Sequence, residues 1–313
     1  MFTALSGALA PVVFLMFLGW LGGYKGYFKR SDVSVFAALV MRYALPFSLF
    51  MGALNTPPDK LHNIPFILCL VFGFVGTYVL ALFAGLVIFR HDLKTSSIQA
   101  LVCTFPDMAY FGAPILQAVC GPEGFLAVLI GNLITSFLIL PATIILSRWS
   151  EMANEEGDSS VWSILGSSLR KTIGNQMVWL PVLGVVLSVS GIKLPAMIEH
   201  SVDMVARTAG GVSLLALGLM FLGERPSFRP ETAANVGMKV ILQPALMLAG
   251  ILMFHVDPDF ARQALIVGAV PTAIAASMYA VRNETYEVIA SDSVVIGTVV
   301  AVFTEALLIA AII

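Results

Sequence analysis

The chain has 313 residues and a formal net charge of −2. Hydrophobic residues make up 58% of it and charged residues 12%, whereas soluble domains average about 45–50% apolar and about 25% charged residues. This composition excludes a soluble globular domain, and the near-neutral charge indicates no nucleic-acid or other polyanionic partner. We therefore expect a protein embedded in a lipid bilayer.

The apolar runs are long enough to cross a bilayer as helices. A hydrocarbon core of about 30 Å needs roughly 20 apolar residues per helix. The runs lack the in/out alternation of an outer-membrane barrel, so an all-α, polytopic fold with ten transmembrane helices is predicted. The N-terminal segment 1–24 lacks a basic region before its apolar core and is therefore interpreted as the first span, not as a cleavable signal peptide. The predicted spans are 5–24, 33–54, 65–89, 96–120, 124–147, 173–191, 197–222, 232–254, 260–281 and 286–311.

Span two carries a permanent charge in an apolar run. Arg42 lies about ten residues into this span, within the stretch "MRYALPFSLF". An arginine at mid-span costs at least about 2.5–3.5 kcal/mol on insertion scales, so it must face a partner or a wet cavity.

Span four, "SIQALVCTFPDMAYFGAPILQAVC", is interrupted near its middle by Pro106. Proline removes a backbone N–H and clashes with the carbonyl four residues earlier, which breaks or kinks a helix and frees backbone groups. The next residue, Asp107, has two interpretations. It caps the second half of the span by accepting backbone N–H bonds, or it binds substrate or a cation or carries a proton.

A long polar stretch between spans five and six divides the chain into two groups of five spans. We expect a first repeat at 1–148, a cytoplasmic linker at 149–172 and a second repeat at 173–313. Because five is odd, the second repeat must enter the membrane from the opposite side. Spans one and six align through Pro11 and Pro181, an offset of 181 − 11 = 170.

Span seven repeats the arginine of span two. "RYALPFSLF" aligns with "RTAGGVSLL", which pairs Arg42 with Arg207 at an offset of 207 − 42 = 165, and the same offset pairs Pro106 with Pro271. One offset for two pairs of helices indicates an inverted-topology repeat, the usual architecture of secondary transporters. Like Arg42, Arg207 must face a partner or a wet cavity. The alternative to a wet cavity pairs Arg207 with Asp203, one turn earlier.

Span nine is interrupted by Pro271, which Thr272 follows. A single proline is most simply a kink, but two prolines at matching depth in related spans favour two broken helices that cross near the midplane. Their half-helix ends would then face a ligand, with the N-termini favouring anions.

The distribution of Lys and Arg predicts the orientation. Loops after odd-numbered spans carry eleven basic residues, and loops after even-numbered spans carry only Lys60, Lys193 and Arg262. The odd-numbered loops are therefore expected in the cytoplasm, with both termini outside it and the protein in the plasma (inner) membrane. Lys239 lies seven residues into span eight and is expected to extend outward to the cytoplasmic side.

Four segments resemble the auxin efflux carrier family: "YALPFSLF", "PDMAYFGAPIL", "VWLPVLGVVLSVSGIKLP" and "VPTAIAASMYAVRNETYEV". This family includes the plant auxin exporters and bacterial malonate and malate permease-like carriers. The resemblance covers essentially the whole chain and implies a carrier of organic carboxylates. It also implies two inverted five-helix repeats, a scaffold domain and a transport domain, in which helices four and nine cross. The family commonly has asparagine seven residues before a proline of span four, where this chain has Asp107 before Pro114.

The candidate substrate site combines residues of several spans, and Asp107 is also the candidate coupling residue. Most polar residues in membrane bundles merely join helices, so only a few are retained beside the breaks. The predicted substrate-binding residues are Arg42, Pro106, Asp107, Tyr110, Pro114, Asn132, Arg207, Pro271 and Thr272.

A secondary transporter of small organic carboxylates of the malonate or malate type explains these features best. The alternative is a sodium- or proton-coupled carrier of the bile acid symporter or sodium–proton exchanger type. An intramembrane hydrolase is disfavoured because no histidine lies at membrane depth, so no enzyme activity, metal or cofactor is expected. No GxxxxGK[ST] motif is present, so a gradient of H+ or Na+ would drive transport. The expected partners are the carboxylate and the bilayer, and a homodimer is left open.

Overall fold

The computed structural model describes residues 2–55, 63–152, 176–223 and 226–312. Within these ranges the protein is helical, with one isolated β-bridge and no strand. Many large apolar side chains are exposed on the outer helices, including Phe83, Leu252, Phe303 and Leu307. Exposed apolar surface on this scale is typical of contact with lipid rather than water.

Six helical stretches are long and apolar enough to cross a membrane. They match the predicted spans two, three, five, seven, eight and ten: Val33–Asn55, Ile64–Val87, Leu126–Ser150, Ala196–Met220, Pro230–Phe254 and Glu287–Ile312. Their component helices are α2 (Val33–Leu39), α3 (Leu45–Asn55), α5 (Ile64–Val87), α8 (Phe125–Ile134), α9 (Leu140–Met152), α12 (Ala196–Ala206), α13 (Thr208–Met220), α14 (Pro230–Gly237), α15 (Gln243–Phe254) and α18 (Glu287–Ile312).

The other four predicted spans correspond to α1, α11 and two broken helices. Their bounds are α1 (Phe2–Tyr24), α11 (Gln176–Ser190), α6 (Leu93–Thr104), η3 (Met108–Gly112), α7 (Ala113–Cys120), α16 (Pro258–Ala269) and α17 (Ile274–Arg282). The protein is therefore a multi-pass, all-helical membrane protein. Helix α9 runs to Met152, and the rest of the predicted linker 149–172 lies outside the described residues.

Prolines explain where the long helices widen into π-helical turns. Four five-residue π-helical segments occur in the described chain: η2 (Val40–Ala44), η3, η5 (Thr135–Ile139) and η6 (Met238–Leu242). Each ends two residues before a proline, namely Pro46, Pro114, Pro141 and Pro244. A proline cannot bond the carbonyl four residues earlier and clashes with it, so the preceding turn widens without ending the helix.

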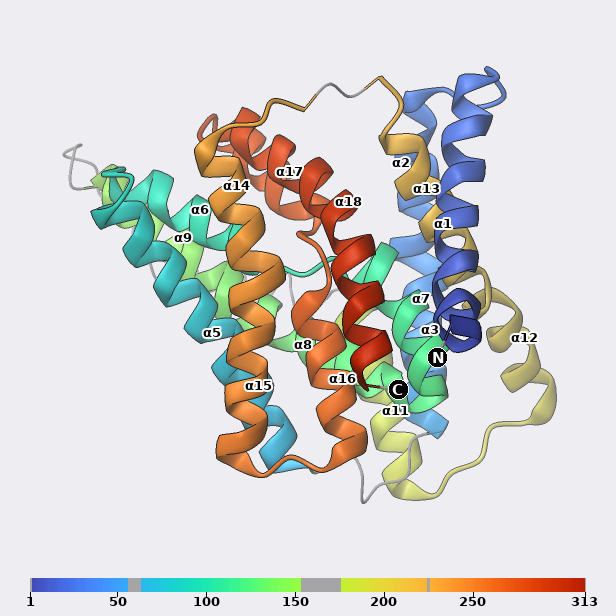
Figure 1. The fold of residues 1–313 in the computed structure, drawn as a ribbon. Helices are drawn as coiled ribbons and strands as arrows, with labels where there is room; N and C mark the ends of the chain where they lie inside the picture. The colour runs from blue at the N-terminus through green and yellow to red at the C-terminus, as the bar shows by residue number, and fades with distance from the viewer. Residues whose placement is uncertain (1, 56–62, 153–175, 224–225, 313) are drawn as a thin grey trace.

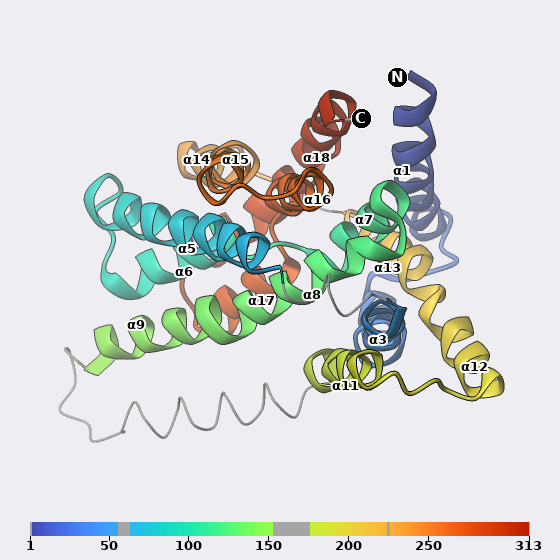
Figure 2. The ribbon, with the colours of Figure 1, turned by 90° about the horizontal axis from the view of Figure 1, so that it is seen from below.

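The helices form two groups that lie side by side in both views (Figures 1 and 2). The first group holds α1, α3, α11, α12 and α13, with α1 packed along α13 and α3 along α11. The second group holds α5, α6, α9 and α14 to α18, with α5 packed against both α6 and α15. Helices α7 and α8 lie between the two groups (Figure 2).

Two close helix contacts in the first group are related by the offset that pairs the arginines. A Cβ atom at Gly19 of α1 would lie 2.0 Å from the Leu215 carbonyl oxygen of α13, and one at Gly184 of α11 would lie 2.6 Å from the Phe50 carbonyl oxygen of α3. The two contacts share one offset, since 184 − 19 = 215 − 50 = 165. Small residues let membrane helices approach to backbone contact. Packing therefore relates spans one and six by the same offset as spans two and seven, and not by the larger one that aligned Pro11 with Pro181.

The first halves of the broken helices show this offset too. Helix α6 spans Leu93–Thr104 and α16 spans Pro258–Ala269, each 12 residues long. The offset between them is the same at both ends, since 258 − 93 = 269 − 104 = 165.

Candidate functional site at the helix crossing

The two helix breaks lie against each other. Asp107 N donates to Pro271 O at 2.8 Å, and Ala273 N donates to Phe105 O at 2.8 Å. These bonds form an antiparallel bridge between Pro106 and Thr272. The predicted breaks in spans four and nine, and their contact, are confirmed. Each segment supplies the backbone partners that the other loses by leaving its helix.

Thr272 satisfies the carbonyl that Pro106 leaves free. In an unbroken helix, the N–H at position 106 would bond the carbonyl of Val102, four residues earlier. Proline has no N–H, and the Thr272 hydroxyl donates to Val102 O instead, at 2.9 Å. Because Thr272 is only 2% exposed, water has little access to this position and cannot readily replace the hydroxyl as the donor to Val102 O.

Asp107 caps the second half of span four, as one of its two interpretations predicted. Its Oδ1 accepts from Tyr110 N at 3.2 Å at the start of η3. The other oxygen, Oδ2, is buried and has no hydrogen-bond partner among the described residues. With only 3% of its surface exposed, Asp107 can stabilise the half-helix with one oxygen and bind a proton or cation with the other.

Lys239 lies beside the crossing and does not extend outward. The prediction that it reaches the cytoplasmic side is wrong, because the residue is 0% exposed. Its Nζ donates to Thr104 O at 3.3 Å and to Gln243 Oε1, and Gln243 Nε2 donates to Thr104 O at 3.2 Å. Thr104 is the last residue of α6, so the ammonium lies at the negative end of a half-helix.

Glu305 of α18 brings a second carboxyl group to this region. It is 0% exposed, and neither of its oxygens has a hydrogen-bond partner among the described residues. Helix α18 packs against η6, the segment that carries Lys239, and Asp107 follows three residues after Thr104, whose carbonyl accepts from Lys239. Three ionisable side chains from different elements therefore converge next to the crossing.

The other predicted residues of spans four and five lie around this centre. Tyr110 is buried in η3. Pro114 lies in the first turn of α7, where it faces Gly210 of α13, whose Cβ would lie 3.7 Å from the proline ring. This contact joins the crossing to the first group of helices. Asn132 lies on α8 with its Nδ2 buried and unpartnered among the described residues.

In this conformation neither arginine has a hydrogen bond or ion pair with the described residues of the crossing. Arg42 is exposed in η2 and forms no ion pair with a described residue. Arg207 lies at the junction of α12 and α13, where its Nε is 2.6 Å from Asp203 Oδ2 and its side chain is 76% exposed. The alternative that pairs Arg207 with Asp203 is confirmed.

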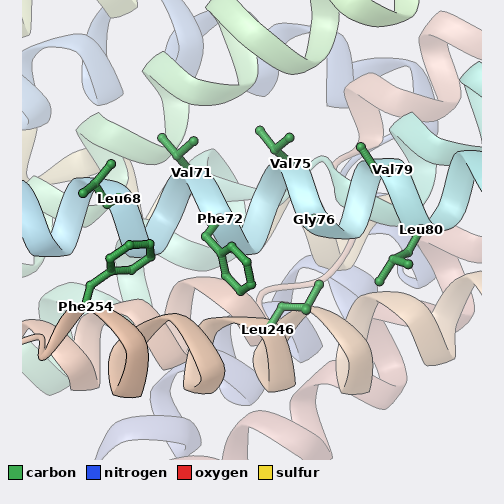
Figure 3. A pocket seen from close by; sticks show the side chains of 9 residues that line it. All are labelled: Leu68, Val71, Phe72, Val75, Gly76, Val79, Leu80, Leu246 and Phe254. Carbon is green, nitrogen blue, oxygen red and sulfur yellow. The ribbon is translucent and has the colours of Figure 1, made fainter.

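A cavity of about 520 Å³ lies elsewhere, on the outer side of α5 and α15. Figure 3 shows that glycine and apolar side chains line it, among them Phe72, Leu246 and Phe254. It offers no charged or hydrogen-bonding side chain to a polar ligand. Such a lining does not favour a charged ligand.

Comparison with known proteins identifies the family. The model of the membrane transport protein family matches residues 4–309. The chain belongs to this family. It is 27% identical over 290 residues to the uncharacterized transporter YfdV of Escherichia coli (strain K12), covering 91% of the chain and 90% of that relative.

Two further relatives agree with the resemblance seen in the motifs. A putative malonate transporter of Rhizobium meliloti (strain 1021) is 22% identical over 307 residues, covering 96% of the chain and 93% of the relative. A probable auxin efflux carrier component 5c of Oryza sativa subsp. japonica is 25% identical over 148 residues, covering 45% of the chain and 40% of the relative. The membership in the auxin efflux carrier family is confirmed.

Sequence reasoning missed two residues of the cluster, Lys239 and Glu305. One signal was present for the lysine: Gln243 follows it by four residues, so two polar side chains share one face of an otherwise apolar helix. Glu305 had no such partner in the sequence, because its neighbour Lys239 lies on another helix.

Proposed function

We propose that the protein is a secondary active transporter of small organic carboxylates, most simply a dicarboxylate of the malonate or malate type. The observation that carries this proposal is the bridge between two broken helices, at Pro106 and Thr272, beside a buried lysine. Broken helices in a membrane are tolerated where they line a site, and they present half-helix ends to a substrate. The name of the malonate relative supports the substrate class.

Helix α17 offers the better of the two half-helix N-termini for an anion. Asp107 occupies the start of η3 with its own carboxylate, whereas no side chain caps the start of α17 after Ala273. The uncapped N–H groups and the positive end of the helix dipole favour a substrate carboxylate there. Lys239 adds positive potential from within the bundle, at the end of α6.

Arg42 and Arg207 are proposed to bind the second carboxylate of the substrate. In this conformation neither is hydrogen-bonded to the crossing, and both are exposed. They belong to the first group of helices, which touches the crossing through Gly210 and Pro114. We propose that the two groups move relative to each other, so that the arginines approach the substrate in one state of the cycle.

Alternating access follows if the two halves are inverted repeats that exchange conformations. The common offset supports this architecture, since it relates the glycine contacts and the bounds of α6 and α16. The bias of Lys and Arg supports an orientation with both termini outside the cytoplasm and a location in the plasma (inner) membrane. The transporter names of the relatives favour transport over catalysis.

A second candidate is an ion-coupled carrier of the bile acid symporter or sodium–proton exchanger type. The unpartnered carboxylate oxygens of Asp107 and Glu305 favour it, because such groups bind cations. The family relatives favour the first candidate.

Uptake of labelled malonate into proteoliposomes tests the proposal. Malate and succinate should compete for uptake, and an uncharged diamide of malonate should not. Uptake that no carboxylate inhibits would contradict the carboxylate assignment, and bile-acid uptake in its place would favour the second candidate.

A further inference from the structure

The cluster of Asp107, Lys239 and Glu305 has a charge imbalance that the proposed substrate site does not explain. When all three are ionised, two carboxylates and one ammonium leave one net negative charge. The three residues are 3%, 0% and 0% exposed, respectively. An uncompensated charge at this depth is costly, and one bound proton makes the cluster neutral.

The hydrogen bonds of the cluster indicate which carboxyl group takes the proton. Asp107 Oδ1 accepts a backbone N–H at the N-terminus of η3, which stabilises the ionised form. Glu305 has no donor for either oxygen among the described residues. A carboxylate without donors in a buried site is the less stable of the two, so the proton belongs on Glu305.

Lys239 occupies the place where a metal cation would otherwise be expected. Its ammonium contacts the Thr104 carbonyl oxygen and Gln243 Oε1, and Asp107 follows three residues after Thr104. Carbonyl, amide and carboxylate oxygens are the ligands of Na+ sites at broken helices. The Lys239 ammonium supplies the positive charge that a bound cation would otherwise bring to these oxygens. A sodium ion could bind there only by displacing the ammonium.

The buried ionisable groups on the helices packed against η6 include Cys103 of α6 and, on α18, both Glu305 and Asp292, whose Oδ2 has no hydrogen-bond partner among the described residues. Helices α5, α15 and α16 also pack near η6 but supply no buried carboxyl group. Cys103 donates its thiol to Asn235 Oδ1 at 3.3 Å, which leaves the carboxyl groups to take up a proton.

We propose that Asp107, Lys239 and Glu305 form a proton-binding site, and that H+ and not Na+ is carried together with the substrate anion. This proposal rests on the proposed transport function. An arriving carboxylate makes the region more negative and strengthens proton binding at Glu305, and by linkage the proton strengthens binding of the anion. The proton is taken from water on one side and released to water on the other. Cooperative binding of the two makes the carrier a symporter.

Proteoliposomes that contain a trapped pH indicator test this proposal, with the membrane potential clamped at zero. Malonate entry should acidify the lumen in the wild type. For coupling to one proton, a gradient of one pH unit should drive about tenfold accumulation of malonate. A Na+ gradient should drive none. Malonate entry without acidification, or accumulation driven by Na+, would overturn the proposal.

Glu305→Gln separates coupling from transport, since the amide keeps the shape of a protonated carboxyl. We expect this variant to lose accumulation driven by the pH gradient while malonate–malonate exchange persists. Glu287→Gln is the matched control, because Glu287 is exposed in the first turn of the same helix and should behave as wild type. Proton-driven accumulation by Glu305→Gln would refute the assignment of the proton. Absence of any malonate exchange in the wild type would overturn the proposed function as well, whereas net malonate entry without acidification of the lumen overturns the symport alone.

Discussion

At the scale of single residues, the crossing is held together by groups that proline has freed. Pro106 has no N–H to donate to the Val102 carbonyl, which accepts a hydrogen bond from the Thr272 hydroxyl instead. The sequence predicted Pro106, Asp107, Pro271 and Thr272 at this place because proline signals are local. Lys239 and Glu305 escaped prediction because depth in a span does not say which face of the helix a side chain occupies. The π-helical turn at Met238–Leu242 makes that face harder still to infer.

Thr272→Val tests the bond between the two broken helices. Valine keeps the shape of threonine but leaves the Val102 carbonyl without its donor, which should cost about 1–3 kcal/mol of stability. Thr272→Ser keeps the hydroxyl and serves as the control. Thermal unfolding of the purified protein in detergent should show a lower midpoint for valine than for serine. Equal midpoints for the two variants would show that this hydroxyl does not hold the crossing.

At the scale of helices, most of the predicted spans were found, and their irregularities follow from particular residues. The breaks after Thr104 and Ala269 were predicted from Pro106 and Pro271. Pro46, Pro141 and Pro244 widen helices without breaking them, and proline alone did not distinguish these outcomes. The difference lies in tertiary partners: the broken segments have each other's backbone groups to bond.

Gly184→Val tests the backbone contact between α11 and α3. A side chain at Gly184 would collide with the Phe50 carbonyl oxygen, which cannot move without shifting α3. Overpacking of this kind costs about 1–3 kcal/mol. Gly237→Ala is the control, because nothing lies within 4 Å of its Cβ position. Thermal unfolding in detergent should show a loss of stability for Gly184→Val alone, and an unaffected midpoint would argue against close packing here.

At the scale of the whole molecule, the first helix of each predicted repeat packs against a helix of the other repeat. Helix α1 of the first half packs on α13 of the second, and α11 of the second packs on α3 of the first. Sequence comparison found the common offset for spans two and four, whereas the proline pair misaligned spans one and six. Prolines at those positions lie within continuous helices and do not fix the register. The reciprocal glycine contacts fix the register of the helices, because each contact needs a small residue directly opposite one backbone carbonyl.

Labelling of single cysteines tests the proposed orientation. Tyr27 lies in the loop after α1, and Asp259 lies in the first turn of α16. Figure 1 shows the α1–α2 and α15–α16 connections at opposite ends of the molecule. In a Cys120→Ser background, where Cys69 and Cys103 are buried, Tyr27→Cys should react only from the cytoplasm. Asp259→Cys should react only from outside with a membrane-impermeant maleimide. Labelling of both from one side would contradict the opposite orientation of the two repeats.

The central claim is that the crossing of the broken helices is where a carboxylate is carried, and malonate counterflow in proteoliposomes tests it most directly. The wild type and Pro11→Ala, which changes a proline inside α1, should both show counterflow. Pro106→Ala should slow it at least about tenfold while the purified protein stays folded, because the restored N–H competes with Thr272 for the Val102 carbonyl and closes the break. Counterflow by Pro106→Ala at the wild-type rate, or none in the wild type, would contradict the account.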